Sequence, residues 1–269
     1  EAVRQDRAAY DLPPGDPRTV TLTRAVVFGA PDVVLLDLPQ LSEDQPAHRP
    51  MVAAHAVPWP GEMAVFRSPG SDGFALLTTF GSRARIGTLV SDFYPGPTSR
   101  FDLGNALVVD MVSGTLESVT DLTLFGGANA LAVEAAPGKW EIVQAGVAEL
   151  IATGRYRLTR LLRGQRGTEA AIGNPTPAGA RVVILDTALA PLPIAEADLG
   201  LPWNWRIGPA ARSVSDASYT PLAFTPAGRG LVPFAPVHVA QPWRTARSPG
   251  DLTIRWTRRS RALVADTWE

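Results

Sequence analysis

Short runs of alternating or continuous hydrophobic residues, separated by glycine and proline, extend through most of this chain. Alternation is typical of strands with one buried face, and short apolar runs fit strands that are buried on both faces. Strands are predicted over residues 19–23, 32–38, 51–57, 64–67, 74–80, 84–91, 106–112, 140–144, 145–150, 156–162 and 180–185, with edge strands at 202–206 and 218–223. We therefore predict a mainly β protein of one or two antiparallel barrel or sandwich subdomains with few short helices.

Two segments between these strands carry specific local signals. Residues 68–73 combine serine, proline, aspartate and glycine, which predicts the turn of a hairpin. Residues 118–131 have leucines at loosely helical spacing, which predicts a short helix. Thr120 or Asp121 would cap this helix, and the glycine pair at 126–127 would end it early.

The same pattern divides the chain into three regions. Residues 1–18 are polar and proline-rich, which predicts a lead-in and linker. Residues 19–235 form the β-rich region, in which a subdivision near residue 100 stays open. Residues 236–269 resemble the first strands of a β-sandwich, with Trp256 as a candidate buried residue of the second strand. Such a module needs roughly 90–100 residues, so we predict an incomplete one, or strands that pack on the main body or on another copy.

Composition narrows the class of protein. The chain has 269 residues, of which 45% are hydrophobic, as in an ordinary globular protein with a substantial core. Its formal net charge of −1 provides no global field that would attract nucleic acid. The lack of cysteine excludes disulfides and thiolate metal sites. No apolar run approaches the roughly 18 residues of a membrane helix, so no membrane span is predicted.

The sequence lacks the motifs of common catalytic sites. The three histidines, His48, His55 and His238, do not have metal-ligand spacing. His55 lies in an alternating strand, where a hydrogen-bonded structural role is expected. No nucleophile elbow, phosphate-binding loop or dinucleotide fingerprint occurs. We therefore predict that the chain is not an enzyme and has no catalytic, cofactor-binding or metal-binding residues.

Two pairs of carboxylates keep a hydrolase alternative open. Glu141 with Glu149, or Asp102 with Asp110, could approach each other on neighbouring strands as the acid and base of a glycosidase. Such pairs act at separations of about 5–10 Å. Surface carboxylates that are solvated or salt-bridged are the simpler interpretation, with Asp102 as a turn residue.

The most unusual stretch is GRYRLTRLLRGQRGTE, residues 154–169. Its pattern predicts a strand that ends in a glycine turn. Its five arginines are Arg155, Arg157, Arg160, Arg163 and Arg166. In a structural interpretation, they pair across strands with Glu141, Glu149 and Glu169. In a functional interpretation, they form a patch for the phosphates or sugar acids of a cell surface.

Two tryptophans are further candidates for an interaction surface. Trp203 and Trp205 lie close to prolines in turn-like surroundings, where a ring can anchor an interface or stack on a sugar. Core packing is the default interpretation for both. Arg258, Arg259 and Arg261 allow the same two interpretations as the arginine run.

Several short motifs occur in an order that resembles a known family. They are Pro58–Gly61, Ala64–Arg67, Gly87–Leu89, Phe101–Asn105, Gly114–Ser118, Gly127–Ala132, Trp140–Gln144 and the arginine run. Over roughly residues 30–269 this order resembles the C-terminal part of the large tail-tip or baseplate hub proteins, which determine host specificity, of gene transfer agents and related tailed phages. Residues 251–261 resemble the opening strands of the fibronectin type III module that follows in that family.

The resemblance implies a structural component of a phage-like tail tip or baseplate, which acts in assembly and in attachment to the recipient cell. It implies other tail or baseplate subunits as partners, a homo-oligomer in the intact particle, and synthesis in the bacterial cytoplasm before release with the particle. The family's glycoside-hydrolase-like barrel has no counterpart here. The charged N-terminus without a starting Met is interpreted as that of a fragment. Two alternatives stay open: a carbohydrate-binding host-recognition module whose partner is a cell-surface glycan, and a cell-wall glycan hydrolase.

Overall fold

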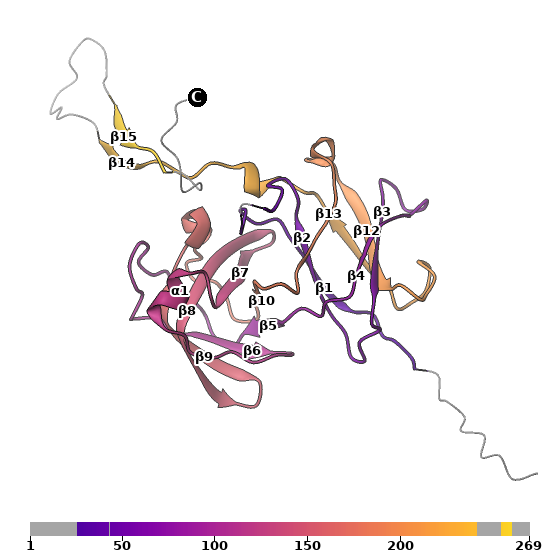
Figure 1. The fold of residues 1–269 in the computed structure, drawn as a ribbon, viewed down its shortest axis with the longest axis horizontal. Helices are drawn as coiled ribbons and strands as arrows, with labels where there is room; N and C mark the ends of the chain where they lie inside the picture. Colours follow the sequence, from indigo (N-terminus) through magenta and orange to yellow (C-terminus); the bar gives the residue numbers. More distant parts are fainter. Residues whose placement is uncertain (1–25, 43, 241–253, 260–269) are drawn as a thin grey trace, which may run out of the picture.

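The computed structural model describes residues 26–42, 44–240 and 254–259, and in these ranges the protein is mainly β (Figure 1). A six-stranded barrel lies beside two packed sheets, and a two-stranded hairpin projects from them. This architecture of an antiparallel barrel and sheets with few short helices confirms the predicted fold class. The lead-in predicted at 1–18 and the strand predicted at 19–23 lie outside the described residues.

The barrel closes in the order β10-β5-β6-β9-β8-β7, and every neighbouring pair of strands is antiparallel. Its strands are β5 (Ile86–Leu89), β6 (Leu107–Met111), β7 (Ala130–Ala136), β8 (Lys139–Ala152), β9 (Arg155–Leu162) and β10 (Arg181–Ile184). Successive strand residues point to opposite faces, so alternate side chains fill the interior. Leu131, Val133 and Val143 are fully buried in this inner core.

Two further sheets pack against each other. The first has the order β1-β2-β11 and the second β13-β12-β3-β4. Their strands are β1 (Asp32–Leu36), β2 (Met51–His55), β11 (Ala190–Pro191), β3 (Met63–Ser68), β4 (Ala75–Phe80), β12 (Trp203–Pro209) and β13 (Thr220–Phe224). The turn between β3 and β4 confirms the predicted hairpin. β12 lies between β13 and β3, so the prediction of an edge strand at 202–206 is wrong, whereas β13 is an edge strand.

The first of these sheets is a middle layer that is buried on both faces. All five residues of β2 are buried. Met51 and Ala53 belong to the core shared with Trp140 of the barrel, while Val52 and Ala54 belong to the core shared with β12. Burial on both faces explains why β2 reads as a continuous apolar run instead of an alternating one.

The barrel is inserted within the sequence of the two sheets. The chain enters it between β4 and β5 and leaves it between β10 and β11. The sequence left open whether the β-rich region divides near residue 100. This residue lies between β5 and β6, inside the barrel segment. At the entry point, the Ala84 amide donates to the Ala54 carbonyl at 2.9 Å, which connects the barrel segment to β2.

A histidine and an arginine meet beside this connection. His55 is only 4% exposed, and its Nε2 lies 2.7 Å from Nη2 of Arg83. Since the guanidinium only donates, the imidazole Nε2 accepts. Burial lowers the pKa of His55, the charge of Arg83 lowers it further, and Asp32 opposes them without reversing the shift. The structural, hydrogen-bonded role expected for His55 is what the structure shows.

The helices are few and short. Helix α1 (Asp121–Phe125) begins after Thr120, whose Oγ1 accepts from the Thr123 amide at 3.4 Å, and it ends at Gly126. These are the predicted cap and stop signals. The remaining turns are the 3-10 helices η2 (Gln165–Gly167), η3 (Glu169–Ala171), η4 (Glu196–Asp198) and η5 (Arg229–Leu231). None of the described helices is long and apolar enough to cross a membrane.

Two strand predictions in the barrel differ from the structure. Strand β7 begins at Ala130, inside the segment predicted as helical, and was not predicted as a strand. Strand β8 is one strand of 14 residues instead of the two predicted at 140–144 and 145–150. Both differences affect the same hairpin, in which β7 and β8 pair from Ala130 opposite Gln144 onward.

The C-terminal hairpin consists of β14 (Val237–Ala240) and β15 (Arg255–Thr257). Trp256 is 61% exposed, so the prediction that it is a buried tryptophan is wrong. Arg259 follows β15, and its Nη2 lies 2.6 Å from Oε1 of Glu169, which ties this segment to the main body. Arg261 lies outside the described residues.

Candidate functional site

Two arginines of β9 join this strand to neighbouring elements. Arg155 forms a two-bond pair with Asp110 of β6, with distances of 2.6 and 2.7 Å. Arg160 forms a similar pair with Asp121 at the start of α1, in which Nη2 to Oδ2 is 2.6 Å. The hydrogen bonds from these guanidiniums lower the pKa of both aspartates. These two arginines therefore link β9 to β6 and to α1.

Arg163 is the centre of a buried ionic network. Its Nε and Nη2 donate to the two carboxylate oxygens of Glu141 at 2.6 and 2.9 Å, and its Nη1 lies 3.2 Å from Oδ2 of Asp102. Nη1 also donates to the Tyr94 carbonyl at 2.9 Å, and the guanidinium carbon lies 3.8 Å from the Phe93 ring centre. The three charged side chains are 0%, 0% and 2% exposed. A buried charge is tolerated only when it is paired and hydrogen-bonded, as here.

Asp102 is both a member of this network and a turn residue. Its Oδ1 accepts from the amides of Gly104 and Asn105, each at 3.1 Å, which bears out the predicted turn role. Burial raises the pKa of this carboxyl, but hydrogen bonds from Asn105, Arg163 and Gly104 lower it more, so the net pKa is below its usual range. The carboxylate therefore stays charged beside the arginine.

The turn after β9 is fixed by the same residues. The Gly164 amide donates to Glu141 at 3.2 Å, and Gly164 adopts the left-handed region that favours glycine. The Thr168 hydroxyl accepts from the Ile142 amide at 2.9 Å and donates to the Gln165 carbonyl at 2.7 Å. The turn at 164–168 is thus bonded to β8 at both of its ends.

The other two arginines of the run are exposed and form no ion pair with the described residues. Arg157 lies opposite Glu149 in the β8–β9 register, but the predicted ion pair between them is not formed. Arg166 projects from the turn with φ of 57°, a conformation that non-glycine residues rarely adopt. Glu169, which was predicted to pair within the run, pairs with Arg259 instead. The predicted pairing is therefore found only between Arg163 and Glu141.

The two candidate tryptophans lie in different surroundings. Trp205 is fully buried, and its Nε1 donates to the Phe224 carbonyl at 3.2 Å. It therefore has no surface to offer a partner. Trp203 is half-buried, and Arg67 covers its ring with the guanidinium carbon 4.3 Å from the ring centre. The structure does not bring these rings together with the arginines of β9, because they lie on the four-stranded sheet.

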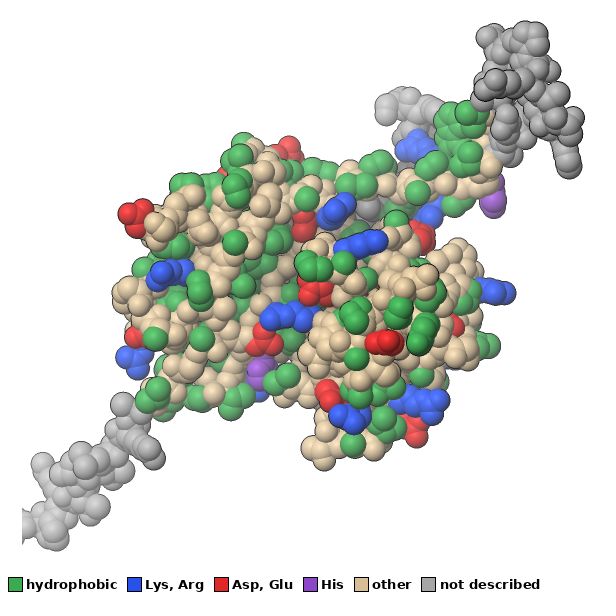
Figure 2. All heavy atoms as spheres, turned by 180° about the vertical axis from the view of Figure 1, so that it is seen from behind, with side chains coloured by type: hydrophobic (Ala, Val, Ile, Leu, Met, Phe, Trp, Pro, Cys, Tyr) green, Lys and Arg blue, Asp and Glu red, His purple; other side chains and the backbone are tan. Residues whose placement is uncertain are grey.

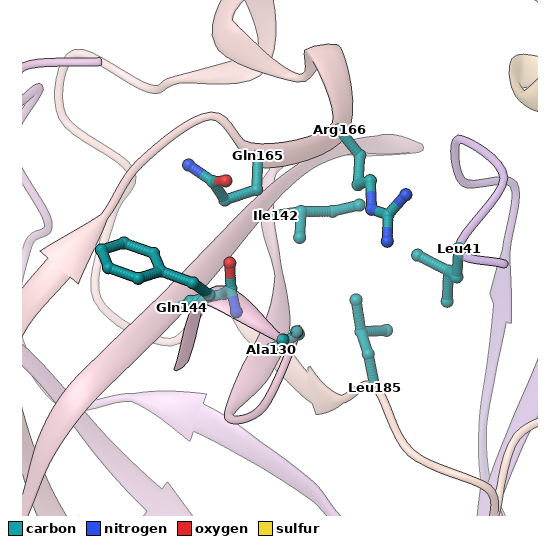
Figure 3. A pocket seen from close by; sticks show the side chains of 10 residues that line it. Leu41, Ala130, Ile142, Gln144, Gln165, Arg166 and Leu185 are labelled. Atoms are coloured by element: carbon teal, nitrogen blue, oxygen red, sulfur yellow. The ribbon is translucent and has the colours of Figure 1, made fainter. Parts of the chain in front are cut away.

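A pocket of about 370 Å³ lies on the outer face of the barrel, beside the fixed turn (Figure 3). Its walls are the end of α1, the start of β7, the outer face of β8 and the turn itself, with Leu41 and Leu185 beside them. Figure 3 shows the Arg166 side chain reaching into the space between Ile142, Leu41 and Leu185. Arg166 is the only charged residue of the described part of the chain that lines this pocket.

Two carboxamides complete the polar lining of the pocket. Gln144 is 8% exposed, and its Nε2 donates to the carbonyls of Leu124 and Ala128 at 2.7 and 2.9 Å. The Nε2 of Gln165 donates to the Arg163 carbonyl at 3.0 Å. Both nitrogens are thus engaged by the protein, while neither Oε1 accepts a hydrogen bond from the described residues. The pocket combines one cationic donor with two free acceptors.

The structure separates both candidate glycosidase pairs. Glu141 and Glu149 lie eight positions apart on β8, which corresponds to about 26 Å along a strand. Asp102 lies opposite Leu161 and Asp110 opposite Arg155, so six positions of β9, or about 20 Å, separate them. Neither pair is within the roughly 5–10 Å that glycoside hydrolysis uses.

Charges on the face seen in Figure 2 are mixed, with Lys or Arg beside Asp or Glu and no large area of one sign. Among the residues that the structure describes, no group of three or more His, Cys, Asp or Glu side chains could hold a metal ion.

Comparison with known proteins gives a match for the barrel. Residues 84–183 match the family model described as Rcc01698-like, C-terminal. Its name is that of a gene associated with the gene transfer agent of Rhodobacter capsulatus, so the match is consistent with a gene transfer agent protein. The matched residues run from just before β5 to Val183 in β10, so they include all six barrel strands except the last residue of β10. No curated protein matches the chain.

Sequence reasoning missed several contacts of this region. Asp110 and Asp121, the partners of Arg155 and Arg160, are far from them in the chain, and no local signal connects them. Gln144 and the pocket that it lines were not predicted either, because the walls come from separate segments.

Proposed function

We propose that this chain is a structural component of the tail tip or baseplate of a phage-like particle of the gene transfer agent type, which acts in assembly and in attachment to the recipient cell. The observation that carries the proposal is that the family match covers the complete set of barrel strands. A matched segment that coincides with one structural unit indicates that the barrel is the module shared with that family.

The pattern of ionic contacts supports a role as scaffold. Three of the five arginines of residues 154–169 form ion pairs inside the chain, and the most buried of them, Arg163, joins β8 to the segment that carries Asp102. Such pairs fix the geometry of a barrel without offering reactive groups. The glycan hydrolase alternative is the weaker one, because the two candidate carboxylate pairs lie far apart.

The proposal includes partners and location. The chain would contact other tail or baseplate subunits, would form a homo-oligomer around the axis of the particle, and would leave the bacterial cytoplasm with that particle. An epitope tag on the chain tests this directly. We expect the tag in purified particles and, by immunogold negative-stain imaging, at one end of the tail. A tagged chain that is folded in the cell but absent from purified particles would contradict the proposal.

A further inference from the structure

We propose that the pocket beside Arg166 binds a small acidic saccharide, with the carboxylate or phosphate of the sugar on the guanidinium. The inference deepens the attachment role proposed above, because acidic sugars are a chemical class found on cell surfaces. The arginines of β9 and of the turn after it differ in whether this chain supplies them with a carboxylate. Arg155, Arg160 and Arg163 are neutralised by carboxylates of this chain, whereas Arg166 is exposed and unpaired among the described residues.

The charge of the pocket favours an anion. Arg166 is its only charged lining residue in the described part of the chain, so no carboxylate competes for the guanidinium. A guanidinium presents a planar fork of donors that matches a carboxylate or a phosphate, and such charge-assisted bonds are stronger than neutral ones. Figure 3 shows this group directed into the pocket and not away from it.

The other polar groups of the pocket, the side-chain oxygens of two glutamines, favour a ligand that carries hydrogen-bond donors. The side-chain nitrogens of Gln144 and Gln165 are engaged by backbone carbonyls, which leaves their oxygens as acceptors toward the pocket. Gln144 is more than nine-tenths buried, so its orientation is fixed. Chloride and sulfate have no donors for these oxygens, and inorganic phosphate has at most two, whereas a sugar presents several hydroxyls.

The apolar parts of the pocket fit the same ligand class. Phe125 is 66% exposed and lines the pocket, and an aromatic ring can pack against the C–H face of a sugar. Ile142 and Leu185 provide further apolar surface. A volume of about 370 Å³ is at the small end of the 300–1,000 Å³ typical of ligand sites. It suits a small saccharide better than a long polymer segment.

The backbone of the turn that carries Arg166 is held in position before any ligand arrives. This turn is bonded to β8 through Thr168, and the buried Arg163 network holds its first residue through Glu141. A Cβ on Gly167 would overlap the ring of Phe234, so this glycine is required where the two segments meet. Arg166 itself keeps a left-handed backbone that most side chains avoid. Such preorganisation lowers the cost of binding, and strained residues cluster at functional sites.

The test is a titration of the purified chain, followed by NMR, with glucuronic acid, glucose 6-phosphate and glucose. We expect either acidic sugar to bind at least tenfold more tightly than glucose, since a charge-assisted hydrogen bond to the guanidinium is stronger than a neutral one. The tighter of the two acids identifies carboxylate or phosphate as the natural group. Equal binding of glucose, or binding of an oligo-glutamate peptide without any sugar, would overturn the proposal.

A variant pair separates loss of the ligand from loss of the fold. Arg166→Asn removes the charge and places a residue that tolerates a left-handed backbone, so its Tm should equal or exceed that of the parent while acidic-sugar binding falls at least tenfold. Arg157→Gln, at an exposed and unpaired arginine of β9, should leave binding unchanged. Retained affinity in Arg166→Asn, or an equal loss in Arg157→Gln, would contradict the assignment.

The sugar proposal and the particle proposal can fail separately. Sugar binding is measured on the isolated chain, and incorporation is measured on purified particles. Arg166→Asn should enter particles as efficiently as the parent chain, because this side chain contacts no ion-pair partner of the described fold. A chain that binds acidic sugar but never enters particles would reject the particle role alone, and the reverse result would reject the pocket assignment alone.

Discussion

A guanidinium that is buried between two carboxylates stabilises the fold only while all three groups stay in place. Arg163 contacts Glu141, Asp102 and the Tyr94 carbonyl, so it joins β8, the turn at Asp102 and the end of β9. The stacked ring of Phe93 covers it from water. Replacing the whole network by apolar residues could be neutral, but removing one partner leaves unpaired buried charges.

The first prediction concerns this residue. Arg163→Gln should lower the free energy of unfolding by about 3–5 kcal/mol, because it leaves Glu141 and Asp102 buried without a cation. Arg157→Gln is the matched control and should change the stability by less than about 0.5 kcal/mol, since its side chain is exposed and unpaired. Urea unfolding followed by circular dichroism measures both. Equal midpoints for the two variants would show that the buried network contributes nothing.

A second residue-scale prediction concerns acid. The lowered pKa of His55 means that the unfolded chain takes up a proton at a higher pH than the folded protein. The free energy of unfolding should therefore fall as the pH falls below the usual histidine value of 6.5 and on toward the folded pKa. His55→Gln should flatten the slope between about pH 7 and 5. Urea unfolding at a series of pH values measures this, and an unchanged slope in the variant would contradict it.

At the scale of elements, the sequence predicts most strands well. Strands β1, β3, β4, β6, β9 and β10 are close to their predicted ranges, because short apolar or alternating runs between turn residues are a local property of the sequence. β7 was missed because its sequence is rich in alanine and because its first residues overlap the segment whose leucines have helical spacing. β12 was taken for an edge strand because the prolines around Trp203 suggested a turn. Its place between β13 and β3 depends on long-range pairing.

The candidate site was predictable only in part, for the same reason. The pair between Arg163 and Glu141 follows from two adjacent antiparallel strands, and it was among the predicted ones. Asp110 and Asp121 face their arginines because of the barrel register and the position of α1, which no local pattern specifies. The pocket brings together separate segments, so its existence depends on tertiary packing that periodicity does not describe.

At the scale of the whole molecule, the middle sheet serves two cores. Its β2 strand covers the outer face of the barrel with one set of side chains and the four-stranded sheet with the other. The barrel is closed and has its own inner core, yet Ala132, Trp140 and Val183 on its outer face belong to the core that it shares with this neighbour. The two parts are therefore expected to unfold together.

The third prediction follows from this shared core. Residues 84–185 expressed alone should form the barrel but expose Ile86, Trp140 and Val183 to water. Exposed apolar patches favour association, so this fragment should self-associate in size-exclusion chromatography and bind a hydrophobic dye, unlike the full chain. A monomeric fragment that binds no dye and melts at the temperature of the full chain would show that the middle sheet contributes little to the barrel.

The order of the strands also matters while the chain is being made. β3 and β4 leave the ribosome before the barrel, but β12, which pairs with β3, follows only after the last barrel strand. At translation rates of about 5–20 residues per second, synthesis of the barrel takes on the order of 5–20 s. Throughout that interval β3 lacks its partner β12, so we expect the nascent polypeptide to expose apolar surface that ribosome-associated chaperones recognise.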